Sequence, residues 1–266
     1  MTITPNKWEL DVQGYLNVCN ITDATPRKQI RDFSAGVNDL GLWNSMVCWP
    51  LRSSQNYGSG TTAFSLGGLG TYNGTLTNGP SWGADGVTFD GTDDRIDTNL
   101  VIQAGASGGV STTAGGADRS IWSSRVTGAN WTHGSSLLAR ENTDGNALVD
   151  VGGDANSRIR ATGSAILNQY AFTQATHTLA GTNIAANTSF RQNKNARSVG
   201  GYVVGSNENM GTSLENVKIG SSPSGGQRMS GTMSFVYIAT AIYSAVQQES
   251  LYDLYKSTLG QGLGLP

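Results

Sequence analysis

WGADGVTFDGTDDRID, residues 82–97, is the segment of the sequence that is most informative about the fold. Residues 86–89 and residues 95–97 have the composition of short strands. Between them, Asp90-Gly91 and Asp93-Asp94 are typical of a tight turn, because glycine adopts a positive backbone angle and aspartate side chains bond turn amides. The stretch is therefore predicted to be a strand, a turn and a second strand.

Similar patterns continue along most of the chain, which has 36 glycines among 266 residues and only 14% charged residues. This composition favours short strands joined by turns over a helical bundle. Within residues 231–239, Phe235 and Tyr237 alternate with Val236 and Ile238, so large side chains point to both faces of the strand. This pattern predicts a central strand that is covered on both faces. Residues 52–83 are predicted to form a long loop with short edge strands. Further strands are predicted at residues 120–126, 136–140, 147–151, 158–162, 170–179, 188–192 and 215–219. An all-β protein of two packed antiparallel sheets is expected.

Helical patterns occur near the two ends of the chain. Thr25 occupies an N-cap position and Pro26 a first helical position, which predicts a helix over residues 26–40 that either packs on its own sandwich or docks on a partner. Ser244 begins a second capped helix, predicted over residues 245–256. The glycine-spaced tail after it is expected to lie along a neighbour or to be unanchored. Because the composition changes near residue 40, we divide the chain into an N-terminal arm with a short helix, residues 1–41, and a sandwich with its C-terminal helix and tail, residues 42–266.

Charge and cysteine content limit the classes of partner. The chain has 17 basic and 19 acidic residues, so no overall positive field favours binding to nucleic acid. No signal sequence is recognisable and no apolar run is long enough to cross a membrane, so membrane insertion is not expected. Two cysteines, Cys19 and Cys48, are too few for a disulfide framework and have no metal-ligand spacing.

Residues 82–97 resemble the strand-turn-strand that opens concanavalin A-like and laminin-G-like jelly-roll domains. The closing segments 217–220, 231–238 and 242–245 are similar to the last strands and the short terminal helix of the same family. The resemblance extends from about residue 42 to residue 260. It implies a concanavalin A-like two-sheet antiparallel jelly roll.

Shorter phrases resemble the structural proteins of tailed phages that carry such domains. They are LWNSM at residues 42–46, LGGLGTYNGTL at residues 66–76 and YKSTLG at residues 255–260. This resemblance implies a virion component, such as a capsid decoration protein, a head fibre or a tail-associated protein. Such a protein is made in the bacterial cytoplasm and displayed on the particle exterior. Its expected partners are other virion proteins and further copies of itself.

Catalytic patterns are missing from the sequence. Glycosidases of this fold place two or three carboxylates on one face of a strand, and none of the five glutamates has an acidic residue two or four positions away in a strand pattern. The only histidines are His133 and His177, and no nucleophile elbow precedes a helix. We therefore expect a protein that is not an enzyme and needs no cofactor, with a degenerate glycosidase as the weakest alternative.

Two kinds of ligand remain candidates. Four aspartates near the turn have the carboxylate oxygens that calcium prefers, although most of them also serve as turn formers: Asp90, Asp93, Asp94 and Asp97. Three aromatic residues are candidates for stacking on a sugar ring, although each also fits core packing: Trp122, Trp131 and Tyr202. The alternative function is accordingly a carbohydrate-binding module or lectin that recognises a host-surface or environmental glycan.

The N-terminal segment is the predicted attachment element. Its apolar side chains have no evident role in a sandwich that is already complete: Trp8, Leu10, Tyr15, Leu16, Ile30 and Phe33. An arm of this kind is expected to be mobile alone and ordered when bound. On this interpretation, a chain without residues 2–40 still folds but no longer joins the particle.

Overall fold

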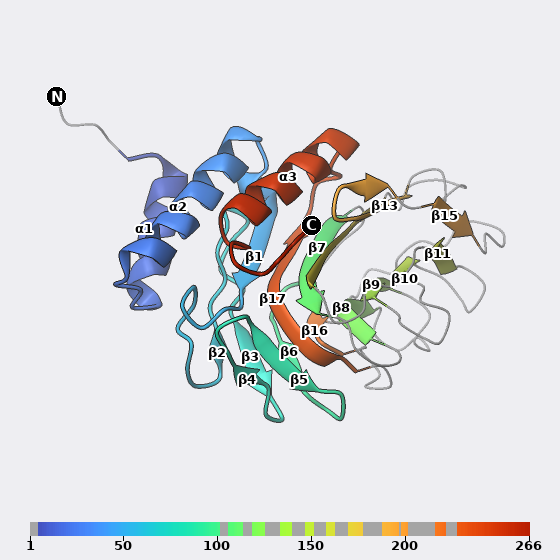
Figure 1. Ribbon diagram of the computed structural model, residues 1–266, viewed down its shortest axis with the longest axis horizontal. Helices are drawn as coiled ribbons and strands as arrows, with labels where there is room; N and C mark the ends of the chain where they lie inside the picture. The colour runs from blue at the N-terminus through green and yellow to red at the C-terminus, as the bar shows by residue number, and fades with distance from the viewer. Residues whose placement is uncertain are drawn as a thin grey trace.

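In the part of the chain that the computed structural model describes, three helices and two antiparallel sheets form three layers (Figure 1). The structure describes residues 5–101, 106–113, 119–125, 134–139, 147–151, 158–162, 170–177, 188–196, 198–201, 216–221 and 228–266. The helices are α1 (Lys7–Val18), α2 (Ala24–Asp39) and α3 (Ala245–Ser257), and a short 3-10 helix spans Trp43–Ser45. They cover one face of the first sheet, and the second sheet covers the other face.

In the described residues the first sheet has eight strands, in the order β14-β13-β12-β7-β17-β5-β4, with β1 also paired to β17. Their bounds are β1 Met46–Pro50, β4 Ser81–Trp82, β5 Val87–Asp90, β7 Ala106–Thr113, β12 Tyr170–His177, β13 Thr188–Gln192, β14 Asn195–Ala196 and β17 Ser230–Ala239. The second sheet has nine described strands, in the order β15-β11-β10-β9-β8-β16-β6-β3-β2. Their bounds are β2 Thr62–Ala63, β3 Gly74–Thr77, β6 Arg95–Asp97, β8 Arg119–Arg125, β9 Gly134–Ala139, β10 Ala147–Val151, β11 Arg158–Thr162, β15 Ser198–Gly201 and β16 Lys218–Ile219. The predicted two-sheet antiparallel sandwich is confirmed.

Strand β17 separates two hydrophobic cores, because its side chains alternate between them. Val236 and Ile238 belong to the core between the two sheets. Phe235 and Tyr237 face the helices and belong to the second core. All four side chains are at most 1% exposed, so the prediction of a central strand covered on both faces is confirmed. The helices are therefore a structural layer of the domain, since they cover an apolar sheet face.

The helix ends follow from local capping. Asp23 caps α2 by accepting a hydrogen bond from the Thr25 backbone N–H at 2.7 Å, so this helix begins two residues before the predicted start. Helix α1 lies where an extended arm was predicted, and the Asn6 backbone N–H donates to Glu9 Oε2 at 2.7 Å at its N-terminus. Ser244 and Gln247 form a capping box at the start of α3, close to its predicted bounds. Among the described residues, no helix has both the length and the apolar character needed to cross a membrane.

Four of the predicted attachment residues lie in the core of their own chain. They are Tyr15, Leu16, Ile30 and Phe33, each at most 4% exposed. Phe33 meets Phe235 of β17 edge to face, with ring centroids 5.4 Å apart. The interpretation that the sandwich does not need these side chains is therefore wrong for these four, because they complete the core over the sheet. Trp8 is half-buried and Leu10 is 57% exposed, so both remain accessible.

The C-terminal tail is anchored on the same core, which corrects the expectation of an extended or unanchored tail. Leu263 and Leu265 are each 7% exposed and belong to the core beneath the helices. Arg52 Nη1 donates to the Gln261 carbonyl oxygen at 2.8 Å, and Lys256 Nζ donates to the Pro266 carbonyl oxygen at 2.6 Å. The tail therefore helps to hold α3 against the sheet.

Candidate functional sites

The turn between β5 and β6 is held by its own carboxylates. Asp90 Oδ1 accepts a hydrogen bond from the Thr92 N–H at 2.7 Å, and Asp94 Oδ2 accepts one from the Asp90 N–H at 2.9 Å. Gly91 has a φ of +81°, the positive angle that the sequence pattern predicted. The bond from Thr92 lowers the pKa of Asp90, and burial raises the pKa of Asp94.

Three of the four predicted calcium ligands lie together. Within the described part of the chain, Asp90, Asp93 and Asp94 form a group whose carboxylate oxygens lie within 4.8 Å of one another. Asp97 does not join them, because Arg95 Nε donates to its carboxylate at 3.0 Å and Thr77 Oγ1 donates at 2.8 Å. The carboxylates of Asp90 and Asp94 already accept turn amides, which accounts for both residues without a metal. Calcium binding here stays a prediction.

The predicted glycan residues fall largely outside the described residues. Trp131 and Tyr202 are not among them, and of Trp122 only the backbone position on β8 is described, opposite Leu137 of β9 and Ile219 of β16. The proposal that these aromatic residues stack on a sugar therefore stays a prediction. The two histidines give no evidence on catalysis either. His133 lies outside the described residues, and only the backbone of His177, on β12, is described.

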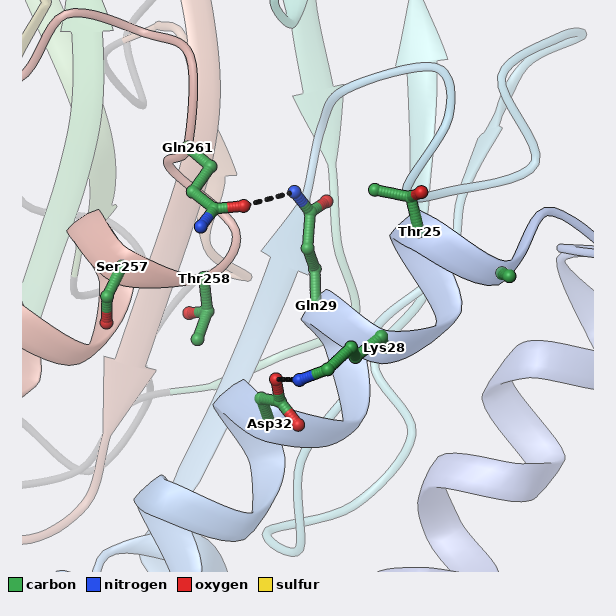
Figure 2. A pocket seen from close by; sticks show the side chains of 8 residues that line it. Thr25, Lys28, Gln29, Asp32, Ser257, Thr258 and Gln261 are labelled. Atoms are coloured by element: carbon green, nitrogen blue, oxygen red, sulfur yellow. Dashed lines mark hydrogen bonds and ion pairs between the residues drawn. The ribbon is translucent and has the colours of Figure 1, made fainter.

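A polar cleft lies between α2 and the end of α3, and sequence patterns did not point to it (Figure 2). Its volume is about 330 Å³. Its lining contains two amides, three hydroxyls and one pair of opposite charges: Gln29, Gln261, Thr25, Ser257, Thr258, Lys28 and Asp32. Figure 2 shows Gln29 and Gln261 facing each other across the cleft, where Gln29 Nε2 donates to Gln261 Oε1 at 3.1 Å, and Lys28 paired with Asp32 along α2.

Buried groups behind the cleft fix its position. The Gln55 side chain is 1% exposed, and its Nε2 donates both to Gln29 Oε1 at 3.1 Å and to the Leu259 carbonyl oxygen at 2.9 Å. The Gln55 amide therefore links Gln29 on α2 to the segment that follows α3. The cleft joins residues more than two hundred positions apart, so only the folded chain creates it.

The outer face of α1 carries two large apolar side chains that the described chain leaves exposed, Leu10 and Val18. Helix α2 lies between α1 and α3, which places α1 at the edge of the molecule (Figure 1). Leu10 is 57% exposed and Val18 is 49% exposed. Gly14 stands midway between them, and a Cβ atom built there meets no atom within 4 Å. Beside this face a hollow of about 480 Å³ opens between α1 and α2, lined by Pro5, Trp8, Glu9, Leu10, Val12, Gln13 and Arg31.

Comparisons with known proteins support the fold at the level of its architecture. No protein-family model and no curated protein sequence matches the chain. Among solved structures, Trypanosoma rangeli sialidase in complex with 2,3-difluorosialic acid is similar with a TM-score of 0.59 at 12% identity, over 88% of this chain and 39% of the sialidase chain. The chain thus spans about two fifths of the length of the sialidase structures that it matches.

Smaller proteins are similar over most of their own length. A heptameric SAP-like pentraxin from Limulus polyphemus has a TM-score of 0.45 at 14% identity, over 61% of this chain and 78% of the pentraxin. The CBM40 of a Ruminococcus gnavus sialidase has a TM-score of 0.43 at 11% identity, over 57% of this chain and 84% of the module. The two-sheet antiparallel sandwich, with α1 and α2 before it in the chain and α3 after it, is supported by the similarity to the sialidase structures.

Proposed function

We propose that the protein is a non-enzymatic structural component of a bacteriophage virion, such as a capsid decoration protein, a head fibre or a tail-associated protein. In this proposal it is made in the bacterial cytoplasm and displays its lectin-like sandwich on the particle exterior. Its partners are other virion proteins and further copies of itself, and it binds neither nucleic acid nor a membrane. The resemblance of residues 42–46, 66–76 and 255–260 to phage structural proteins supports the proposal.

One observation carries the mode of attachment: the uncovered apolar face of α1. Leu10 and Val18 are about half exposed at positions eight residues apart on a helix, where they share one face. Large apolar side chains grouped on one surface mark interaction sites. The attachment element is then the outer face of α1, while α2 and the inner face of α1 hold that helix on the sandwich.

The particle tests this proposal directly. We expect Leu10→Asp to lower the number of copies per particle at least about tenfold, because the contact would bury an unpaired carboxylate. The measurement is quantitative mass spectrometry of purified particles, produced in cells that supply the variant in place of the unchanged protein. Val246→Asp is the matched control, since Val246 is 70% exposed at the start of α3 and far from α1 in the chain.

Two results would contradict the proposal. The unchanged protein could be absent from purified particles, which would exclude a virion role. Alternatively, Leu10→Asp could be incorporated as fully as Val246→Asp, which would place attachment elsewhere on the surface. Circular dichroism of both variants establishes that each is folded before particles are compared.

The polar cleft favours a second candidate function, carbohydrate binding. Amides, hydroxyls and carboxylates are the groups that hydrogen-bond sugar hydroxyls, and the cleft brings such groups together from α2, the end of α3 and the segment that follows α3. None of its lining residues is aromatic, so a glycan there would be held by hydrogen bonds without ring stacking. This function is compatible with a virion protein that displays a binding site outward.

Glycan binding is tested on the isolated protein. For this candidate we expect binding to oligosaccharides on a glycan array, and a roughly tenfold weaker affinity for Gln261→Ala in calorimetric titrations, because one amide is lost from the cleft. Gln13→Ala, which removes an amide from α1 outside the cleft, is the matched control and should bind normally. Absence of binding to every glycan, or equal losses in both variants, would exclude the cleft as a sugar site.

A further inference from the structure

We propose that the outer face of α1 binds the same face of a second copy, with the two helices antiparallel and crossing at Gly14. This inference deepens the proposed function, because it names the molecule that covers the α1 face. The contact is symmetric, so each residue of the face meets a position on an identical helix. Three features of the face favour this occupant.

Gly14 is the first feature. It stands in the interior of α1, where glycine costs about 1 kcal/mol of helix stability relative to alanine. A Cβ atom at this position would meet nothing within 4 Å, so no contact inside the described chain requires a glycine. A second helix crossing here would require one, because the absent side chain lets two backbones approach closely.

The symmetry of the face is the second feature. Leu10 and Val18 lie four residues before and four residues after Gly14, and all three share one side of the helix. In an antiparallel crossing at Gly14, Leu10 of one copy lies against Val18 of the other. Both apolar side chains, which are 57% and 49% exposed in the single chain, are then covered.

The distribution of charge is the third feature. The charged residues of α1 are Lys7, Glu9 and Asp11, all in its first half, and its last turn has no basic residue. Lys7 pairs with Asp11 of its own helix at 2.7 Å, and the antiparallel arrangement brings this pair of the second copy beside the uncharged last turns of the helix, so that no like charges meet. A parallel arrangement would instead bring Lys7 against Lys7.

The size of the face predicts a weak contact. One face of a twelve-residue helix is smaller than the ~800 Å² per partner that a stable interface buries. The isolated protein is therefore expected to be mainly monomeric at low concentration and to associate at about 0.1 mM. On a particle that holds copies side by side, the high effective concentration compensates for weak affinity.

Cysteine cross-linking of the full chain tests both the contact and its direction. Under mild oxidation at about 0.1 mM protein, Gly14→Cys is expected to form disulfide-linked dimers at least about tenfold faster than Val246→Cys, since only the first position meets its own copy. Lys7→Cys is the control for direction, because antiparallel helices place the two copies of this position about 21 Å apart. The natural Cys19 and Cys48 are both buried, so background linking is low.

Gly14→Ala supplies a second, independent measurement. It is expected to raise the Tm of the protein, because alanine favours the helix. It is also expected to weaken self-association about tenfold in sedimentation experiments, because the two Cβ atoms separate the helices. A glycine with only a structural role would alter the Tm and leave association unchanged.

Several outcomes would overturn the inference. These are a protein that stays monomeric at about 1 mM, cross-linking at Lys7→Cys or Val246→Cys as fast as at Gly14→Cys, or self-association that Gly14→Ala does not weaken. The result also separates this inference from the proposed function. Cross-linking at Gly14 in a protein that is absent from particles would contradict only the virion role, whereas incorporation without cross-linking would contradict only the helix pair.

Discussion

Deletion of residues 2–40 is expected to abolish folding of the remaining chain. The deletion removes α1 and α2, and with them Ile30, Phe33 and Val37, which are all 0% exposed. The helix-facing side of β17, including Phe235, would then lie open to water next to α3. Removing several large core side chains at 2–5 kcal/mol each exceeds the 5–15 kcal/mol that stabilises a typical domain. We therefore expect an aggregated or unfolded product.

The measurement is the soluble yield of the truncated chain and its thermal unfolding followed by circular dichroism. Two single substitutions compare the contributions of the inner and outer faces of this segment to the free energy of unfolding. Phe33→Ala, on the inner face, is expected to cost about 3–5 kcal/mol, whereas Leu10→Ala, on the outer face, is expected to change stability by less than about 0.5 kcal/mol. A soluble truncated protein that unfolds cooperatively would restore the earlier interpretation of an arm attached to a complete sandwich.

Features that depend on near neighbours in the sequence could be predicted. Strands β6, β10, β11 and β13 have their predicted bounds, because each is a short run of residues that includes β-branched side chains of high strand propensity. Helix α3 was predictable from Ser244 and Gln247, which satisfy each other's backbone groups within four residues. Turn chemistry and capping are local, so the sequence alone contains the information.

Strand β7 was not predictable, because the strands that stabilise it by pairing, β12 and β17, are distant in the sequence. Its sequence, ASGGVSTT, contains little that favours a strand, yet it pairs with both β17 and β12 in the middle of the first sheet. Gly109 lies opposite Tyr237, and a Cβ atom on that glycine would come within 2.4 Å of the Tyr237 ring. The small residues of β7 thus make room for the large aromatic residues of β17, a relation that spans more than one hundred residues.

The candidate sites also divide into those formed by near neighbours in the sequence and those formed by distant segments. The acidic turn from Asp90 to Asp94 was predictable, since its contacts join residues two to four apart. The cleft beside Gln29 and Gln261 was not, because helix packing brings its two sides together. The sequence also identified the apolar residues of α1, but all of them were assigned to a single attachment surface, because no helix was predicted over residues 7–18. Only the helix separates the buried Tyr15 and Leu16 from the exposed Leu10 and Val18.

Gly86→Ala is expected to lower the free energy of unfolding by about 3 kcal/mol, although the side chain gains only one methyl group. Gly86 precedes β5 within the stretch 82–97 and has a φ of +150°, which residues with a side chain rarely adopt. A Cβ atom there would lie 2.2 Å from the Met233 carbonyl oxygen and 2.9 Å from Ser234 Cα. Both atoms are backbone of β17, so neither can move aside without disturbing the central strand of the sheet.

A second glycine separates the two causes of this loss. Gly60 also has a positive φ, +64°, but a Cβ atom on it would meet nothing within 4 Å, so Gly60→Ala is expected to cost only the backbone strain of about 1 kcal/mol. Urea unfolding of both variants, followed by tryptophan fluorescence, measures the difference. Equal losses of unfolding free energy in the two variants would mean that the β17 backbone shifts at Met233 to accommodate the methyl group. The close approach of β5 to β17 would then not require Gly86. A threefold larger loss of unfolding free energy for Gly86→Ala would mean that residues 82–97 contribute to the fold partly because Gly86 lets the chain at the start of β5 approach the backbone of β17 without a side chain between them.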